Sequence, residues 1–270
     1  VHCKPPAAEK LATDERIRLL SFTGSAQVGW HLKQIAGKKK VLLELGGNAG
    51  IIIHDDANLA TAAARCAMGG FAYSGQSCIS VQRILVHETV FDDFTRRLVD
   101  AAERLPVGDP LDEATVVGPM ISKNDALRVE EWVLEAVEQG AEILTGGRRE
   151  GVVYYPTVLT NTKPAMRVNC REVFAPVVTV EKYDDLDEAF ERVNDSEFGL
   201  QAGIFTGRNE AIFRAFEELE VGGVVANDVP TFRADHMPYG GVKGSGIGRE
   251  GARYALEEMT ERKILVLNLA

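Results

Sequence analysis

The feature that most constrains the fold is a regular alternation of short apolar runs with amphipathic stretches. Apolar runs of strand length recur along the chain, and stretches with a helical period lie between them. The expected strands are "LLSF", "KVLLEL", "GIIIH", "VQRILV", "AEILTGG", "PVVTVEKY", "AGIFTG" and "VGGVVAND", and the expected helices are 25–35, 58–71, 88–105, 125–139, 186–193 and 210–219. Such alternation predicts an α/β fold, with a largely parallel sheet and helices on both faces.

The composition narrows the classes of partner. With 270 residues, of which 45% are hydrophobic, the chain can bury a substantial core. Lys and Arg total 30 against 40 Asp and Glu, a formal net charge of −10, which argues against nucleic acid and favours small-molecule partners. Neither a membrane-spanning apolar run nor a basic-then-apolar leader can be recognised, so we expect no membrane partner and a cytoplasmic location.

The cysteines indicate neither a disulfide framework nor a metal site. Cys3, Cys66, Cys78 and Cys170 are scattered, without the close pairs typical of zinc ligands. A free cysteine usually behaves as a small buried hydrophobe, which fits Cys66 and Cys78 equally well. Cys78 differs because it follows the small-residue loop 75–77, whose backbone amides could face a developing anion.

Loops rich in glycine and polar residues are the first places to look for a site, because parallel α/β sheets usually bind ligands where loops leave the carboxyl ends of strands. Gly24 and Ser25, in "FTGS", form either a plain strand-to-helix turn or an anion-binding helix start. Glu44, inside an apolar run, is either an ion-paired acid or a base with a raised pKa. The glycine-rich tail 240–248 fails the dinucleotide fingerprint, because Arg249 stands at the third glycine position.

Taken together, the motifs resemble one family. "SFTGS", "LELGGN", "GQSC", "REVFAPVVTV" and "PYGGVKGSGIGREG" follow one another in an order and spacing that resemble the aldehyde dehydrogenase superfamily over essentially the whole chain. The resemblance is to the catalytic, C-terminal part of such enzymes. It implies NAD(P)-dependent oxidation of an aldehyde to a carboxylic acid, with NAD or NADP as the cofactor.

The resemblance assigns two catalytic roles. Cys78 matches the nucleophile, which adds to the aldehyde, passes hydride to the cofactor from a thiohemiacetal and becomes a thioester. Its own backbone amide would be one oxyanion donor. Glu44 matches the general base that activates the water for thioester hydrolysis, and it would help to deprotonate Cys78.

The same resemblance assigns the cofactor contacts. Gly24 and Ser25 match the turn and helix start that meet the pyrophosphate, where backbone amides and the helix dipole favour negative charge. Glu172 matches the residue that binds the nicotinamide ribose hydroxyls, and Phe174 flanks that end of the cofactor.

The resemblance also predicts a division of the chain. Residues 1–45 would be a remnant of the NAD(P)-binding domain, 46–248 the catalytic domain, and 249–270 a C-terminal helix and an oligomerisation strand, "RKILVLNL". We expect a homo-oligomer, a dimer or tetramer, through that strand. Two family segments have no match, a Trp-Asn-Phe-Pro segment with an oxyanion donor and a Lys-Pro segment at the adenine ribose; Lys4-Pro5-Pro6 stands in the wrong place. We therefore expect this chain alone to be a weak dehydrogenase.

The loop "VPTFRADHMPYGG" resembles the lactaldehyde and short-aldehyde branch. There Arg233 and His236 would hold a carboxylate, phosphate or hydroxyl of the substrate, while an ion pair with a nearby acid is the alternative for Arg233. Two other functions stay open at this point: a truncated, non-catalytic interaction subunit, and a cofactor-independent esterase that uses Cys78 and Glu44.

Overall fold

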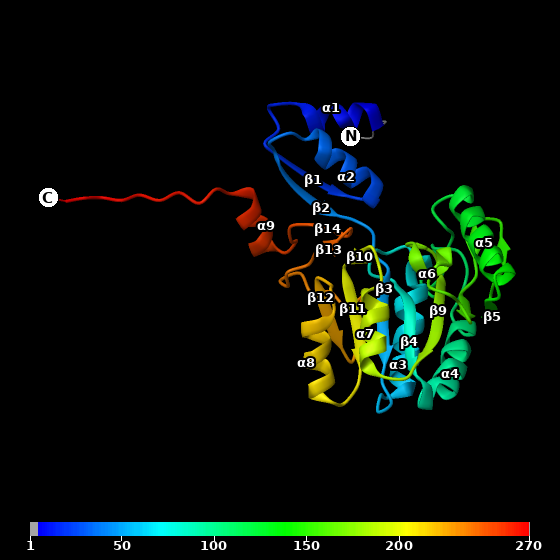
Figure 1. Ribbon diagram of the computed structural model, residues 1–270. Helices are drawn as coiled ribbons and strands as arrows, with labels where there is room; N and C mark the ends of the chain where they lie inside the picture. Colours follow the sequence, from blue (N-terminus) through cyan, green and yellow to red (C-terminus); the bar gives the residue numbers. More distant parts are fainter. Residues whose placement is uncertain (1–4, 270) are drawn as a thin grey trace.

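The computed structural model describes residues 5–269 and contains two main sheets, a large one below and a small one above it in Figure 1. Neighbouring strands of the large sheet are parallel, except that β5 runs antiparallel to β8. In spatial order its strands are β12 (Gly223–Ala226), β11 (Gln201–Phe205), β3 (Ala49–Ile53), β4 (Val81–His87), β9 (Val177–Tyr183), β8 (Thr157–Thr160) and β5 (Glu142–Thr145). The predicted α/β class is confirmed.

Alternate side chains of the central strands point to opposite faces, and each face is covered by helices. Ile51 and Ile53 of β3 pack in one core with α3 (Leu59–Phe71) and α4 (Phe91–Glu103). Ile52 packs in another with α7 (Leu186–Asn194) and α8 (Asn209–Glu218). A third core joins α5 (Lys123–Glu138) and the short α6 (Arg167–Cys170) to β8 and β9.

The small sheet lies beside the N-terminal helices. β1 (Leu19–Thr23) pairs in parallel with β2 (Lys40–Glu44), and β14 (Gly246–Ile247) from the glycine-rich tail pairs antiparallel with β2. α1 (Pro5–Thr13) and α2 (Ala26–Ile35) lie next to β1 and β2 in Figure 1. The runs on either side of Gly46-Gly47-Asn48 therefore belong to different sheets, and these three residues carry the chain from one sheet to the other.

Several short elements carry too little periodicity to be predicted from the sequence. The expected helix 88–105 is a 3₁₀ turn, η2 (Glu88–Val90), followed by α4. The elements without a sequence prediction are α1, α6, β8, η1 (Ala72–Gly75), the hairpin β6 (Arg149–Glu150) and β7 (Val153–Tyr154), the pair β10 (Phe198–Gly199) and β13 (Val242–Lys243), and β14. Most of them are only a few residues long, which is below the length at which an apolar pattern becomes visible.

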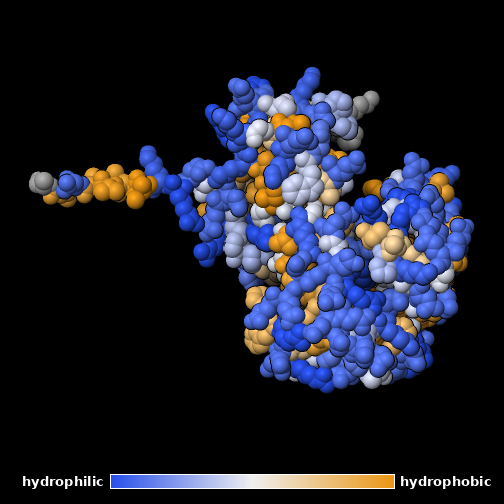
Figure 2. Space-filling model, in the orientation of Figure 1, coloured by the Kyte–Doolittle hydropathy of each residue, from blue (hydrophilic) through white to orange (hydrophobic). Residues whose placement is uncertain are grey.

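The C-terminal segment differs from the expected strand. The predicted C-terminal helix is present as α9 (Ala252–Met259), but "RKILVLNL" forms no strand within this single chain. It extends away from the body, and its apolar side chains are at least 70% exposed (Figures 1 and 2): Ile264, Leu265, Val266, Leu267 and Leu269. A strand needs a partner for its backbone groups, so pairing with a second chain stays a prediction, as does the three-part division of the chain.

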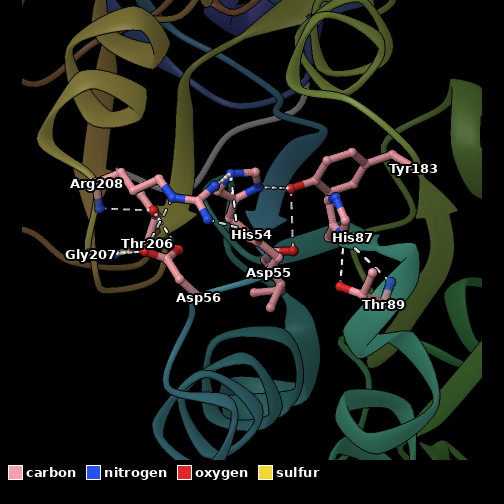
Figure 3. A network of polar contacts seen from close by, with 10 residues as sticks. His54, Asp55, Asp56, His87, Thr89, Tyr183, Thr206, Gly207 and Arg208 are labelled. Atoms are coloured by element: carbon pink, nitrogen blue, oxygen red, sulfur yellow. Dashed lines mark hydrogen bonds and ion pairs between the residues drawn. The ribbon is translucent and has the colours of Figure 1, made fainter.

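A polar network occupies the carboxyl edge of the large sheet (Figure 3). His54 follows β3 and is buried, with Nδ1 2.8 Å from Tyr183 Oη and Nε2 2.7 Å from an Arg208 nitrogen. A guanidinium can only donate, so Nε2 accepts and the proton of a neutral imidazole lies on Nδ1. Asp55 accepts a hydrogen bond from Arg208 at 2.9 Å and neutralises its charge.

This network predicts that the stability of the protein depends on pH. Burial lowers the pKa of His54, so below pH 6.5 the unfolded chain binds a proton that the folded protein refuses. We expect this contribution to lower the free energy of unfolding as the pH drops from 7 to 5, and to be absent in the His54→Gln variant, which cannot titrate at that position. Urea unfolding across this range measures the difference; equal slopes in both proteins would contradict the assignment.

Candidate active site

A groove of about 1070 Å³ lies between the two sheets. Its wall includes every residue that the sequence analysis assigned to catalysis and to cofactor binding: Gly24, Ser25, Glu44, Cys78, Glu172 and Phe174. These residues are spread over about 150 positions of the chain and come together only in the folded protein. Their roles stay predictions, while their convergence on one groove is an observation.

The groove meets different ends of the strands in the two sheets. Gly24 and Glu44 stand at the carboxyl ends of β1 and β2 in the small sheet, where a ligand site was expected. Cys78 precedes β4, and Glu172 precedes β9, so the large sheet contributes its amino edge. The expectation of a carboxyl-edge site is wrong for the large sheet, because its amino edge is the one that faces the small sheet.

Two glycines bring the parts of the groove into contact. The Gly47 N–H donates to Glu172 Oε1 at 2.8 Å, and a β-carbon on Gly47 would collide with the backbone carbonyl of Cys78. A β-carbon on Gly46 would collide with the Glu172 carboxylate. The "GG" of "LELGGN" is therefore needed for close approach of the backbone to both loops.

The loop that carries Cys78 is held in an unusual conformation. Tyr73 and Ser74 have positive φ angles, 53° and 57°, which residues other than glycine rarely adopt. The Ser74 hydroxyl donates to the Gly118 carbonyl at 2.8 Å, which helps to hold this turn. Such strain persists only where the surroundings enforce it, and it is common beside functional residues.

Cys78 differs from the other described cysteines in its surroundings. Cys66, a residue of α3, is fully buried in the core, and Cys170 is exposed, whereas Cys78 is partly buried in the groove. Cys3 lies outside the described residues. Burial raises the pKa of the Cys78 thiol, a hydrogen bond with Tyr239 opposes that rise, and the carboxylates of Glu172 and Glu44 add to it.

Glu44 is a buried carboxyl group at the end of β2. Its Oε2 atom is buried without a hydrogen-bond partner among the described residues. Burial, followed by repulsion from Glu250, raises the pKa of Glu44 to about 8, although Arg249 and Arg233 lower it. An unpartnered carboxyl that titrates near neutral pH, facing the same groove as a cysteine, fits a proton acceptor better than an ion-paired strand residue.

The N-terminus of α2 opens into the groove. Ser25 occupies its N-cap position, but the side chain makes no capping hydrogen bond, and Gly24 is exposed beside it. The first amides of a helix and its dipole attract negative charge, so this end suits a phosphate group. Glu172, whose pKa is raised by burial, offers a carboxylate at the other side of the groove. The donor set therefore fits a dinucleotide with its pyrophosphate at α2 and its ribose hydroxyls at Glu172.

A clamp of side-chain amides holds the Glu172 loop. Gln82 of β4 donates to the carbonyls of Val168 and Arg171 at 2.9 and 2.7 Å and accepts from the Val173 N–H at 3.0 Å. Asn48 donates to the carbonyl of Asn169 at 2.8 Å. The Gln82 bonds tie the loop to β4, the strand that follows Cys78, and the Asn48 bond ties it to the segment before β3.

The two predicted substrate residues do not line the groove. Arg233 forms an ion pair with Glu250 at 2.7 Å, as its alternative interpretation foresaw, and its guanidinium stacks on the Tyr239 ring at 4.2 Å. His236 is exposed. Their substrate roles stay predictions, although Arg233 is only one aromatic ring away from the Cys78 sulfur.

Other groove residues escaped the sequence analysis. Arg128 and Trp132 of α5 stack on each other at 4.8 Å, and Trp30 lines the groove from α2. The spacing of an arginine and a tryptophan four residues apart was the available signal. Tyr239, which contacts Cys78, stands inside the glycine-rich motif, and no feature of the sequence distinguishes it as a site residue.

The described part of the chain shows neither a metal-binding group nor a membrane-spanning helix. Among residues 5–269, no three His, Cys, Asp or Glu side chains are placed to hold a metal ion. Within the same range, no helix combines the length and the apolar character needed to cross a membrane.

Comparison with known proteins decides the family. A model of the aldehyde dehydrogenase family matches residues 3–265. The chain belongs to the aldehyde dehydrogenase family. The resemblance inferred from the ordered motifs is thereby confirmed.

Among curated relatives in this family, the 3-sulfolactaldehyde dehydrogenase of Priestia aryabhattai is 50% identical, with 97% of this chain and 55% of the relative covered. The lactaldehyde dehydrogenase of Methanococcus aeolicus is 43% identical, with 96% of this chain and 56% of the relative covered. The chain thus spans about half the length of the curated relatives that it matches.

Solved aldehyde dehydrogenases have the same fold. Aldehyde dehydrogenase 21 from Physcomitrella patens, in complex with the reaction product succinate, has a TM-score of 0.94 at 46% identity, covering 98% of this chain and 55% of its own. Glyceraldehyde-3-phosphate dehydrogenase from Methanocaldococcus jannaschii, complexed with NADP, has a TM-score of 0.91 at 43% identity. That match covers 93% of this chain and 55% of the enzyme. Betaine aldehyde dehydrogenase from Staphylococcus aureus, in complex with NAD+, has a TM-score of 0.89 at 35% identity. That match covers 93% of this chain and 53% of the enzyme.

The glycine contact predicts a sharp effect of one methyl group. In Gly47→Ala, the new β-carbon must displace the Cys78 carbonyl, so we expect a destabilisation of about 1–3 kcal/mol and a change in the reaction rate of the Cys78 thiol. Gly118→Ala is the matched control, because its β-carbon meets only an ordinary contact with Pro110. Thermal unfolding and alkylation of Cys78 measure both effects; equal behaviour of the two variants would contradict the account.

Proposed function

We propose that this chain forms the nucleophile side of an active site that oxidises an aldehyde to a carboxylic acid with NAD or NADP. The observation that carries the proposal is the convergence of Cys78 and Glu44 on one groove, beside the dinucleotide contacts Ser25 and Glu172. NAD or NADP, when bound, would accept the hydride. The remaining chemistry falls to side chains of this chain.

The first half of the reaction belongs to Cys78. The thiol loses its proton to Glu44, directly or through water, and the sulfur then attacks the aldehyde carbon to form a thiohemiacetal. The backbone N–H of Cys78 stabilises the negative oxygen that develops. Loss of hydride from the carbon leaves a thioester on Cys78.

The second half belongs to Glu44. Its carboxylate takes a proton from a water molecule as that water attacks the thioester carbon; the carbon–sulfur bond then breaks, which releases the carboxylic acid and the Cys78 thiolate. Because the pKa of Glu44 is about 8, the ionised, active fraction grows as the pH rises through that value. Hydrolysis is therefore expected to speed up between pH 7 and pH 9.

The substrate proposed is a small aldehyde with an anionic or hydroxyl group. Relatives named for 3-sulfolactaldehyde and lactaldehyde, and a structure with bound succinate, support this class. Arg233 would meet the anionic end, since its guanidinium stacks on the ring whose hydroxyl contacts Cys78. The exposed segment 262–269 is proposed to pair with a second copy and so to form the homo-oligomer.

A cofactor-independent esterase is a second candidate, favoured by one observation. The nucleophile and the proton acceptor both lie in the groove that this chain builds by itself, and hydrolysis of an activated ester needs nothing more.

Two substitutions test the catalytic assignment. With aldehyde and NAD or NADP, we expect Cys78→Ser to abolish the formation of reduced cofactor, and Glu44→Gln to slow it by at least about a hundredfold. Cys170→Ser, at an exposed cysteine outside the groove, is the control and should retain the original rate. We expect slow turnover by this chain alone, so each rate is compared with that of the unchanged protein. Turnover that survives Cys78→Ser would contradict the proposal.

The substrate class has its own test. We expect Arg233→Ala to reduce kcat/KM about tenfold or more for an aldehyde that carries a carboxylate or sulfonate, but little for a neutral aldehyde of the same length. Arg253→Ala removes an exposed arginine that is likewise paired with a glutamate, and serves as the control. Equal losses for both aldehydes would assign Arg233 to structure alone.

A further inference from the structure

Tyr239 lies directly against the proposed nucleophile. Its hydroxyl oxygen is 3.0 Å from the Cys78 sulfur, and the residue is buried, with 4% of its surface exposed. Neither the sequence motifs nor the proposed mechanism gives this tyrosine a role. Among the described residues, it is the side chain that hydrogen-bonds to Cys78.

The position of the Tyr239 hydroxyl is fixed from several sides. The backbone N–H of Tyr239 donates to the Glu250 carbonyl at 3.1 Å, and the Glu250 N–H donates back at 2.6 Å. Arg233, held by the Glu250 carboxylate, covers one ring face, and Ile79 and Leu200 pack in the same cluster. The hydroxyl is therefore held where it is rather than drawn in by the sulfur.

The surroundings of Cys78 otherwise oppose a negative sulfur. The carboxyl groups of Glu44 on β2 and Glu172 before β9 face it, and the groove wall withdraws it from water. The positive charges nearby, Arg233 and Arg249, act on Glu44. Besides the backbone amide of Cys78, the described site offers one further hydrogen-bond donor to a thiolate, the Tyr239 hydroxyl.

The direction of this hydrogen bond depends on the state of the sulfur. With a neutral thiol, either atom can donate; with a thiolate, only the hydroxyl has a hydrogen to give. A hydrogen bond to a charged acceptor is roughly twice as strong as a neutral one, so the contact favours the thiolate over the thiol. Burial strongly raises the pKa of Tyr239, so its proton stays on the oxygen.

We propose that the Tyr239 hydroxyl donates a hydrogen bond to the Cys78 thiolate and so stabilises the reactive form of the nucleophile relative to the thiol. The inference rests on the proposed nucleophilic role of Cys78. It makes Tyr239 a catalytic residue in direct contact with the reacting sulfur. The tyrosine donates a hydrogen bond and loses no proton, and Glu44 remains the proton acceptor.

The test is the pH profile of Cys78 alkylation by iodoacetamide in the unchanged chain and in Tyr239→Phe. In this reaction the sulfur–carbon bond forms, iodide leaves, and the thiol proton passes to the buffer. Loss of the hydrogen bond should move the midpoint up by about one pH unit. A more basic thiolate is also a better nucleophile, so the rate at the high-pH plateau should rise about threefold while the rate at pH 7 falls about threefold.

This pair of opposite changes separates the proposal from a structural effect. Phenylalanine retains the ring and its packing, and a loosened groove would speed alkylation at all pH values without moving the midpoint. Tyr155→Phe is the matched control, since an arginine, Arg148, also stacks on that ring at 3.5 Å but the residue is outside the groove. A ring-fluorinated tyrosine at position 239, a stronger donor, should move the midpoint down.

The outcomes distinguish this inference from the proposed function. Selective alkylation of Cys78 with the same midpoint in all variants would overturn the role of Tyr239 and leave the nucleophile intact. Formation of reduced NAD or NADP that survives Cys78→Ser would overturn the proposed function, and this inference with it.

Discussion

The contact between Gly47 and the carbonyl of Cys78 is the constraint on which the site depends. At this point the chain passes from the small sheet to the large one, with Glu44 just before the glycines and the large sheet just after. Because Gly47 has no β-carbon, the loop that carries Cys78 can approach this connecting segment closely, while the Gly47 N–H donates a hydrogen bond to Glu172. One short segment therefore sets the relative positions of the proposed base, nucleophile and cofactor carboxylate.

The electrostatics of the groove follow from this close packing. Glu44 and Glu172 are buried with few hydrogen-bond or ion-pair partners that would stabilise their charge, and burial raises the pKa of each. The same carboxylates disfavour a thiolate at Cys78, and Tyr239 offsets this with a donated hydrogen bond. The site thus holds an acid near its neutral form beside a thiol that needs help to ionise, an arrangement suited to passing a proton between them.

The sequence predicted what depends on local pattern and missed what depends on distant contacts. Strands such as β3, a run of isoleucines, and helices such as α3, begun by the Asn58 cap, follow from periodicity and capping. Two-residue strands such as β14 exist only because β2 offers a partner far away in the sequence. Likewise, the ordered motifs identified the family and some of the groove residues, but the amino-edge position of Cys78 and its contact with Tyr239 required the folded chain.

The central claim, that this chain alone assembles a working nucleophile and its proton acceptor, is tested most directly by trapping an acyl group. After brief exposure to a chromogenic acetate ester and an acid quench, peptide mass analysis locates the acetyl group. The account predicts acetylation at Cys78, and the acetyl group, once formed, is lost quickly from the unchanged chain and much more slowly from Glu44→Gln, because Glu44 activates the hydrolytic water. Acetyl groups spread equally over Cys78 and Cys170, or lost equally fast from both proteins, would contradict it.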